Sequence, residues 1–589
     1  MSISRIELPE SDFHQLAIGG GSPDVVKRLW DSEHSRRLVM LRAFLEADGD
    51  DISEAWSVLE TAERVAPGAV RELIMHPQIG SWLAYGLRRH RGGATSSAPS
   101  RHEFAHLNTV AIAAAALAGQ TFRTSVPLRA GQVMVPLFGM ARFDACADWD
   151  SAEAGTEDGR IWLRHGDQLV TVPADGSDAP GWWALRRLTV GDSLRLTVWL
   201  DDLDPWRDLA DPVRPARLSA DAFARWADLL DGAWRILLEG HRELAEGLAA
   251  GVTSLVPLPV GDGWDTRSAS TGDAFGAIMC SPPPDPKTLA VSLAHEFTHI
   301  KLGGLMHLFT MTDGVGRPSL YAPWRDDPRP AGGLLQGIYA FFAITDFWRR
   351  QRLVQRDVLD DFEYAYSKAM TEEALTIALR DGDLSDRGRR FAEALGEAMR
   401  EWPDDDVDGP AARLALIVAD GHRAGWRIRH CHPRAEDVDA LVAAWNGDTG
   451  ERVALKPSDV QPDPEMKHWS AGRLGLARRR LRSPEHYAEA RHADWGATLS
   501  DADLLLFAGE PAKAAAAFAE EIAADPDSFD AWTGLGLALR EDSPAHSPAG
   551  TALTTRPEVV LAVHRRSPAA RSPIDLATWI GGQLGAPAR

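Results

Sequence analysis

The feature that most constrains this chain is a His-Glu-x-x-His pattern at residues 295–299, inside an apolar run from Thr288 to Leu308. A proline-free apolar run of this length favours a buried helix. On a helix, residues four positions apart lie on one face about one turn apart, so His295 and His299 can converge on a single metal ion. Zinc enzymes use this spacing for that reason. The pattern therefore predicts a metal site with two ligands from one helix.

Glu296 lies roughly 100° further round the same predicted helix from His295. This angle makes its carboxylate a poor ligand for the same ion. The side chain can still reach a water molecule or a substrate atom that is bound to the ion. We therefore predict that Glu296 is the catalytic acid or base, and that a third metal ligand comes from elsewhere.

Three residues after the pattern are candidates for the third ligand. His307 follows the pair Gly303-Gly304, which could end or bend the helix and return the imidazole to the ion, and we choose it as the third ligand. Asp313 and Asp346 are the carboxylate alternatives. A carboxylate ligand would make the site a centre of two histidines and one carboxylate, which suits non-haem iron.

A second copy of the pattern, at residues 102–106, is the weaker metal candidate. It directly follows the Gly/Ser/Pro-rich segment 92–99, so His102 would lie in the first helical turn, where helix ends fray. Arg101 adds a positive charge beside the would-be ion. We predict that His102 and His106 belong to an ordinary amphipathic helix start.

Composition places the chain among ordinary globular proteins. It has 589 residues, of which 44% are hydrophobic and 25% charged, with a net charge of −22. So acidic a chain is a poor binder of nucleic acid or anionic membranes, which require a basic field. No run approaches the roughly 20 apolar residues of a membrane span, and the first residues lack a signal-peptide pattern, so we expect a cytoplasmic protein. Three widely separated cysteines predict neither a disulfide framework nor a thiolate cluster.

Hydrophobic periodicity predicts a predominantly helical α+β fold in four regions. Residues 1–100 form a helical N-terminal layer, in which His76 is a turn or capping residue. Residues 101–218 contain a helix and a meandering antiparallel sheet, 219–450 carry the metal site, and 451–589 end the chain. The strand candidates of the sheet alternate apolar residues between glycine turns, and they are Phe122–Leu128, Gln132–Phe138, Ile161–His165, Gln168–Val172 and Ser193–Trp199.

Three other segments bear on the fold. The acidic, Ala/Gly-rich stretch Asp144–Gly159 is predicted to be a flexible loop. The segment Ser268–Ile278 is a strand candidate just before the metal-site helix, where a strand commonly forms the edge of a cleft that holds an extended peptide. Residues 504–539 resemble one tetratricopeptide-like helical pair that caps the main body, and the Pro/Ser/Ala/Arg-rich tail from Glu541 is predicted to be partly loose.

A second chemically suggestive stretch is Tyr321–Pro330, where prolines flank an arginine-carboxylate cluster. The prolines make the segment rigid. The guanidinium of arginine binds a carboxylate through two parallel hydrogen bonds, as an oxo-acid co-substrate or a peptide terminus requires. Alternatively, an internal ion pair between an arginine and Asp326 or Asp327 fixes the loop. Both roles can coexist on different arginines.

The pattern at 295–299, the segment Tyr321–Pro330 and the run Leu335–Ala340 together resemble a known family. This is the family of HExxH-motif peptide-modification proteins associated with ribosomal-peptide biosynthesis, understood as 2-oxoglutarate-dependent peptide β-hydroxylases. The resemblance covers most of the chain. It implies Fe(II) at His295 and His299, with 2-oxoglutarate on the metal and on an arginine. From the chemistry we assign that arginine to Arg325 or Arg329.

The resemblance further implies O₂ and a precursor peptide as substrates, and a possible partner modification enzyme. Two other functions remain open on the residues alone. In a zinc metallopeptidase, His295 and His299 would hold Zn²⁺ while Glu296 deprotonates the attacking water. In a non-catalytic scaffold, the chain would only bind a precursor peptide or a modifying partner.

Overall fold

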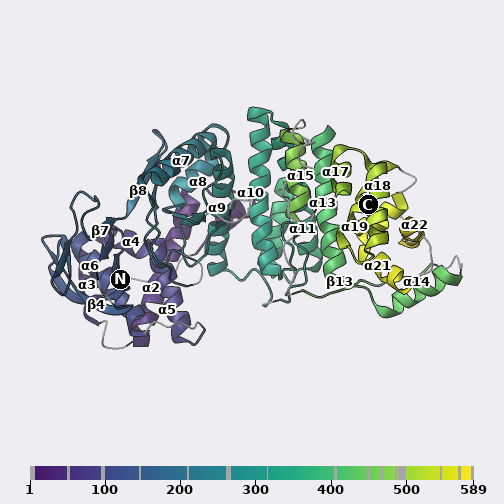
Figure 1. The fold of residues 1–589 in the computed structure, drawn as a ribbon. Coiled ribbons are helices and arrows are strands. Elements are labelled where there is room, and N and C mark those ends of the chain that lie inside the picture. The colour runs from purple at the N-terminus through teal and green to yellow at the C-terminus, as the bar shows by residue number, and fades with distance from the viewer. Residues whose placement is uncertain are drawn as a thin grey trace. The chain divides into compact units, whose positions relative to one another are not determined.

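The computed structural model describes residues 7–48, 53–93, 100–144, 147–208, 211–259, 267–314, 316–403, 407–447, 452–463, 469–483, 487, 499–543, 547–567 and 572–584. The chain forms two compact units, Met1–Phe309 and Thr310–Arg589. The division falls inside the predicted region 219–450. Helices predominate and most strand pairs are antiparallel, which confirms a predominantly helical α+β fold (Figure 1). None of the helices in the described ranges is both long and apolar enough to span a bilayer.

Helices begin and end the first unit. Several start with a proline in their first turn, where its missing N–H costs no hydrogen bond. Ser219 accepts a hydrogen bond from the Ala222 amide and so caps its helix as predicted. The helices are α1 (Glu10–Ala17), α2 (Pro23–Asp48), α3 (Ser53–Val65), α4 (Pro67–Met75), α5 (Pro77–His90), α6 (Ser100–Leu117), α7 (Ala220–Gly240), α8 (Arg242–Gly251) and α9 (Pro286–Leu308).

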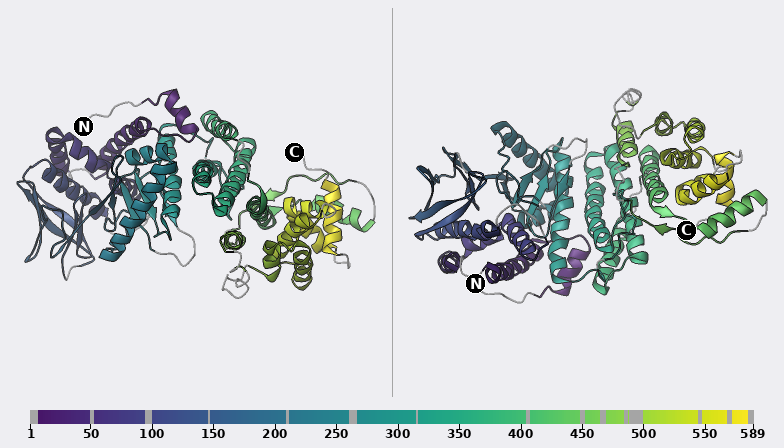
Figure 2. Two further views of the ribbon diagram at one scale, coloured as in Figure 1. Left: turned by 90° about the horizontal axis from the view of Figure 1, so that it is seen from above. Right: turned by 60° about the horizontal axis from the view of Figure 1, so that its bottom comes forward.

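The first sheet of this unit has seven strands in the order β6-β5-β4-β1-β2-β3-β7, all antiparallel. Helix α6 packs across β1, β2, β4 and β5, and its alanines are buried in the same core. The strands of this sheet are the blue arrows of Figure 2. The predicted antiparallel meander is therefore present. The strands are β1 (Phe122–Arg129), β2 (Gln132–Val135), β3 (Gly139–Arg142), β4 (Trp149–Glu157), β5 (Arg160–His165), β6 (Gln168–Thr171) and β7 (Trp182–Ala184).

The predicted loop Asp144–Gly159 is wrong over most of its length, because β4 lies there between β1 and β5. Ala152 and Ala154 are buried against α6, so small residues occupy inward positions where strands more often have β-branched residues. The acidic residues that suggested a loop face outward, and Glu153 pairs with Arg123 at 3.2 Å. The alternating pattern of β4 was not recognised in the sequence because its inward residues are small.

The second sheet has five strands in the order β11-β12-β10-β9-β8 and lies next to α9. β10 runs parallel to both β9 and β12, whereas the two edge strands are antiparallel to their neighbours. The predicted strand Ser193–Trp199 belongs here, and the candidate Ser268–Ile278 divides into β11 and β12. The strands are β8 (Arg186–Val190), β9 (Leu196–Leu200), β10 (Ser254–Pro257), β11 (Ser268–Ala269) and β12 (Ala277–Cys280).

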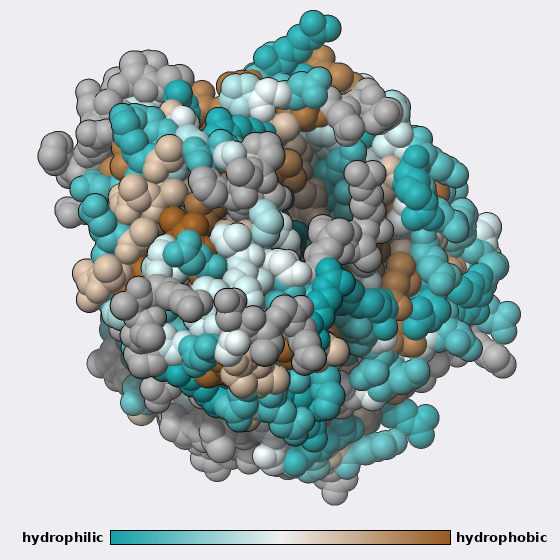
Figure 3. Space-filling model, turned by 90° about the vertical axis from the view of Figure 1, so that its right-hand side faces the viewer, coloured by the Kyte–Doolittle hydropathy of each residue, from teal (hydrophilic) through white to brown (hydrophobic). Residues whose placement is uncertain are grey.

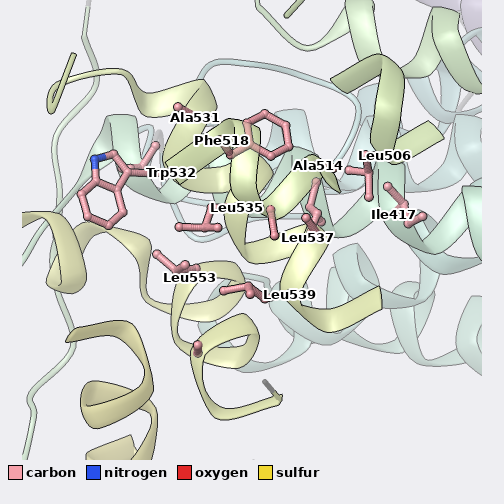
Figure 4. Close-up of a cluster of buried hydrophobic side chains, with 14 of the residues drawn as sticks. Ile417, Leu506, Ala514, Phe518, Ala531, Trp532, Leu535, Leu537, Leu539 and Leu553 are labelled. Atoms are coloured by element: carbon pink, nitrogen blue, oxygen red, sulfur yellow. The ribbon is translucent and has the colours of Figure 1, made fainter. Parts of the chain in front are cut away.

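In its described residues, the second unit has helices and one short strand pair, β13 (Cys431–His432) with β14 (Asp459–Val460). A large buried cluster that includes Ile417, Phe518, Trp532 and Leu553 joins its helices (Figure 4). The helices are α10 (Ala331–Gln355), α11 (Val358–Asp381), α12 (Asp386–Arg400), α13 (Gly409–His430), α14 (Ala435–Gly447), α15 (Ala471–Arg482), α17 (Asp501–Ala508), α18 (Pro511–Ala524), α19 (Phe529–Asp542), α20 (Ser547–Thr555), α21 (Pro557–Arg566) and α22 (Pro573–Leu584).

The tetratricopeptide-like pair corresponds to α18 and α19, which pack against each other. The prediction of a loose tail is wrong for residues 547–567 and 572–584, which form α20 to α22. Leu553, Val560 and Ile580 of these helices are fully buried. Prolines that suggested disorder instead start α21 and α22. Helix α20 packs closely on α19, since a Cβ at Gly536 would lie 2.6 Å from the Leu553 side chain.

Large hydrophobic side chains seldom reach the surface in the described ranges. The face shown in Figure 3 is mainly hydrophilic, with hydrophobic residues in small separate patches. The large hydrophobic residues that are exposed are scattered along the chain: Ile18, Val39, Val65, Leu169, Leu353, Val354, Val358 and Leu416. Most large hydrophobic side chains of the described ranges therefore lie in the cores.

Candidate metal centre

The pattern at residues 295–299 lies on α9, which confirms the predicted helix. Asp285 caps the helix by accepting a hydrogen bond from the Thr288 amide at 2.8 Å, and Pro286 occupies the first turn. Most of the helix is buried between neighbouring elements of the first unit. The imidazoles at positions 295 and 299 therefore project from a helix that is fixed on several sides.

Two contacts fix α9 near the histidines. Phe297 packs so closely on α8 that a Cβ at Gly251 would lie 2.5 Å from the ring. One turn further on, the Lys301 ammonium donates to the carbonyls of Gly19 and Gly20 at 2.9 and 2.8 Å. Burial lowers the pKa of Lys301 to about 7. These contacts fix the rotation of α9 and hence the direction in which His295 and His299 point.

The side chains of His295 and His299 converge as predicted. Their Nε2 atoms lie 3.1 Å apart, and their rings meet at 72°. Two nitrogens bound to one ion by bonds of about 2.0–2.1 Å are separated by about 3–3.4 Å at ordinary coordination angles. The observed separation lies within this range, so a single ion can bind both nitrogens.

Both imidazoles are neutral near pH 7. Burial lowers the pKa of His295 to about 4, and burial together with the neighbouring imidazole lowers the pKa of His299 to about 4. A neutral imidazole has a free lone pair on one ring nitrogen, whereas the protonated ring has none. The pair is therefore ready to bind a cation without first losing protons.

Glu296 lies beside the two histidines rather than away from them. Its Oε1 is 3.7 Å from Nε2 of His295, and one of its oxygens lies within 4.8 Å of a ring nitrogen of each histidine. The other oxygen, Oε2, accepts a hydrogen bond of 2.6 Å from the Ser270 hydroxyl. The carboxylate can therefore act on a molecule at the ion or join the ligand set. It lies closer to the two histidines than the helical angle alone predicts.

Ser270 is held in place by the loop between β11 and β12. Asp273 in this loop accepts hydrogen bonds from Arg36 at 3.1 Å and from Arg88 at 2.8 Å. Gly272 approaches α9 so closely that a Cβ there would lie 3.0 Å from the ring of His307. The loop is thereby fixed along α9, and Ser270 holds one oxygen of the catalytic candidate.

His307 does not join the other two histidines. The predicted break at Gly303 is wrong, since α9 continues to Leu308. Eight residues of helix separate His307 from His299, a rise of about 12 Å. Instead, Nδ1 of His307 lies 2.5 Å from Oε1 of the buried Glu33 on α2. His307 and Glu33 form an ion pair or neutral hydrogen bond that joins α9 to α2.

The other predicted site residues belong to the second unit. Asp346 pairs with Arg349 at 2.6 Å and Arg350 at 2.9 Å, and the amide of Asp313 donates to the Asp383 carbonyl. The metal group around His295 contains neither carboxylate.

The segment Tyr321–Pro330 forms a closed loop. Leu320 and Arg329 exchange two backbone hydrogen bonds, of 3.0 and 2.8 Å, across its base. Asp327 accepts from Arg325 at 2.7 Å and from Arg329 at 3.4 Å. The expected internal ion pairs are therefore present, and both arginines remain partly exposed.

Asp326 plays a different part from its neighbour Asp327. It is buried, its Oδ2 accepts from the Trp469 amide at 3.0 Å, and its carbonyl contacts Nε2 of His430 at 2.7 Å. Tyr321 at the start of the loop lies 2.8 Å from Nδ1 of His422. These buried contacts fix the loop on α13 of the same unit, so its predicted rigidity has a source beyond the prolines.

The earlier copy of the pattern does not form a metal group. His106 is buried with Nδ1 2.9 Å from the Thr109 hydroxyl and its ring edge-on to Trp82. Glu103 pairs with Arg89, and His102 packs beside Trp149. The described side chains of this helix start serve packing, as the sequence predicted.

Sequence reasoning missed Ser270 and Glu33. Ser270 lies 26 residues before Glu296, and Glu33 lies 274 residues before His307. No local spacing connects either pair. The only available signal was that the strand candidate at Ser268 directly precedes the metal-site helix.

A comparison with models of known families found no match, and a comparison with curated proteins found no significant similarity.

Proposed function

We propose that this chain is an Fe(II)- and 2-oxoglutarate-dependent β-hydroxylase of a ribosomally made precursor peptide. The observation that carries the metal part of the proposal is the 3.1 Å approach of the Nε2 atoms of His295 and His299. The hydroxylase part rests on the resemblance in the pattern at 295–299 and the segment Tyr321–Pro330. The geometry thus supports a metal site, and the resemblance supplies the reaction and the co-substrate.

The ligand set fits an iron(II) centre. Two neutral imidazoles are common ligands of Fe(II), and the Glu296 carboxylate is close enough to act on a molecule bound to the ion. Such a set leaves positions open for a keto acid and O₂. When bound, the iron and 2-oxoglutarate supply the oxidising chemistry that replaces a C–H bond of the peptide by C–OH.

The residues around the centre suggest how a peptide is held. β11 is the edge strand of the five-stranded sheet, and an extended peptide can add to such an edge through backbone hydrogen bonds. Ser270, which follows β11, contacts Glu296 directly. A peptide on this edge would lie beside the carboxylate, so Glu296 would position the substrate relative to the metal.

A zinc metallopeptidase is the second candidate, and the position of Glu296 favours it. A carboxylate oxygen 3.7 Å from a ligand nitrogen lies where a general base could take a proton from a metal-bound water. The same edge strand would hold the peptide. The two functions differ in the metal and in the co-substrate.

The test uses the full chain, stripped of metal and reloaded anaerobically with Fe(II) or Zn(II). The Fe(II) protein, exposed to air with 2-oxoglutarate, should release succinate, and His299→Ala should release none. The zinc protein should leave a peptide library intact. If the Fe(II) protein releases no succinate and the zinc protein cleaves peptides, the peptidase is correct. If neither occurs with metal bound, the chain is a scaffold.

A further inference from the structure

His76, Asp201 and Asp204 form a second compact group in the first unit. One nitrogen or oxygen of each side chain lies within 4.8 Å of the others, and all three residues are at most 2% exposed. His76 stands between α4 and α5, and the two aspartates lie in the turn after β9. The fold therefore encloses three ligand-type side chains away from solvent.

Each aspartate uses only one oxygen for the local turn. Oδ1 of Asp201 accepts from the amides of Leu203 and Asp204 at 3.2 and 2.9 Å, and Oδ1 of Asp204 accepts from the Trp206 amide at 2.8 Å. The Oδ2 atoms of both are buried and have no hydrogen-bond partner. The backbone thus fixes two carboxylates and leaves one oxygen of each unused.

The side chain of His76 likewise lacks hydrogen-bond partners. Its two ring nitrogens are buried without a hydrogen-bond partner, and Nε2 lies 3.9 Å from Oδ2 of Asp201. It lies in the turn between α4 and α5, as predicted, and its side chain makes no capping hydrogen bond. An imidazole nitrogen without a hydrogen-bond partner is free to bind a cation.

The nearby arginines do not donate hydrogen bonds to the Oδ2 atoms of Asp201 and Asp204. Arg207 donates to the carbonyls of Asp204 and Arg214, at 2.7 and 2.5 Å. Arg37 likewise donates to the carbonyls of Ile74 and His76. Their charges are close, but their hydrogen bonds go to the backbone rather than to the free Oδ2 atoms.

Asp202, between the two aspartates, shows the ordinary alternative. Its carboxylate pairs with Arg186 at 2.7 Å and Arg217 at 3.3 Å. One buried acid of this turn is therefore satisfied by guanidinium groups, while its two neighbours are not. Unpaired buried polar atoms cost free energy, so their concentration at one point indicates a missing partner.

We propose that His76, Asp201 and Asp204 enclose a divalent first-row transition ion that stabilises the first unit. An imidazole nitrogen with two carboxylate oxygens suits such an ion. Donor atoms around an ion with bonds of about 2.1 Å are about 3–4.2 Å apart, and 3.9 Å between His76 and Asp201 lies in this range. Because the site is closed, the ion would enter as the unit folds and exchange slowly.

The test uses the full chain carrying His295→Ala and His299→Ala, so that the centre on α9 contributes no metal. The protein is expressed with added zinc, dialysed against a chelator and measured for zinc per chain. We expect about one equivalent of zinc to remain. His76→Gln and Asp204→Asn should each weaken zinc binding at least about a hundredfold, since even indirect support of a ligand is worth 10–100-fold.

Asp202→Asn is the matched control, because it alters a buried acid of the same turn that already has arginine partners. It should keep the zinc. If His76→Gln does not fold, Asp204→Asn refolded with and without zinc decides the question. Zinc should raise the melting temperature of the parent and leave that of Asp204→Asn unchanged. Absence of zinc from the parent, or equal zinc in all variants, would overturn the proposal.

Discussion

The Ser270 hydroxyl donates a 2.6 Å hydrogen bond to Oε2 of Glu296, which connects the loop after the edge strand β11 to the helix that carries the histidines. The loop is itself held by Arg36 and Arg88 through Asp273. Glu296 therefore has a fixed orientation relative to both His295 and His299 and the strand edge. This relationship allows its role to be tested apart from metal binding.

The first prediction concerns Glu296→Gln. In a hydroxylase, metal content should stay near that of the wild type and part of the succinate release should survive, because the oxidant derives from O₂. In a peptidase, the same change should abolish turnover, since no base remains to activate water. Metal analysis and succinate release measured on one preparation separate the two cases.

Ser270→Ala is the companion variant. It removes one hydrogen bond to a charged group, worth about 1.5–3 kcal/mol, while keeping the carboxylate. We expect peptide hydroxylation to fall by roughly ten- to a hundredfold with metal content unchanged. Unchanged hydroxylation would show that the Ser270 contact does not position Glu296 for the reaction.

The second prediction concerns the metal ligands. His295→Ala and His299→Ala should each remove the iron bound at α9, because a single imidazole provides too few ligands. His102→Ala, in the earlier copy of the pattern, should bind iron like the wild type. Iron content after anaerobic loading gives the answer, and iron loss in His102→Ala with iron retained in the other two variants would place the site at the earlier copy instead.

The third prediction concerns Arg325 and Arg329, whose assignment to 2-oxoglutarate stays a prediction from the sequence. A charge-assisted pair of hydrogen bonds contributes about 1.5–3 kcal/mol, so Arg→Ala at the responsible position should weaken 2-oxoglutarate binding roughly ten- to a hundredfold. Arg→Lys should give an intermediate affinity, since it keeps the charge and loses the planar geometry.

Folding provides the control for these arginine variants. Both side chains pair with Asp327, so a purely structural arginine would lower the melting temperature instead of the affinity. If both alanine variants fold, bind iron and keep the wild-type affinity for 2-oxoglutarate, the assignment is wrong and the loop is structural.

The fourth prediction concerns acid stability and His106. Burial lowers the pKa of His106 to about 3, from an ordinary value near 6.5. Between these values the unfolded chain binds one more proton at this residue than the folded chain does. The free energy of unfolding should therefore fall as pH falls from about 6.5, by up to about 1.4 kcal/mol per pH unit from this residue.

His106→Leu should remove that contribution to the slope, as measured by urea unfolding at several pH values. Phe104→Leu is the matched control, since it alters a buried neighbour that does not titrate. The control should lower stability at every pH and keep the wild-type slope. An unchanged slope in His106→Leu would show that this imidazole is protonated in the folded protein.

Residues close together in sequence were the predictable part of the site. The 295–299 spacing sufficed to bring two imidazoles to one point, because a helix fixes the geometry of residues four apart. The assignment of His307 failed because glycines within a well-packed helix need not break it. Gly303 and Gly304 instead allow close approach, as where Phe275 meets Gly304.

The unpredicted parts depend on tertiary contacts. Nothing near Ser270 or Glu33 identifies its partner on α9, and β4 was mistaken for a loop because alanine fills its inward positions. The group of His76 with Asp201 and Asp204 joins segments more than a hundred residues apart. Periodicity predicts which faces are buried, but it does not predict which polar groups meet inside.

The most direct test of the central claim is the visible absorption of the anaerobic Fe(II) protein on addition of 2-oxoglutarate, which needs no peptide substrate. Chelation of the keto acid by iron produces a charge-transfer band. The account predicts this band in the wild type and its loss in His299→Ala. A wild-type protein that holds Fe(II) at His295 and His299 but develops no band with saturating 2-oxoglutarate would contradict it.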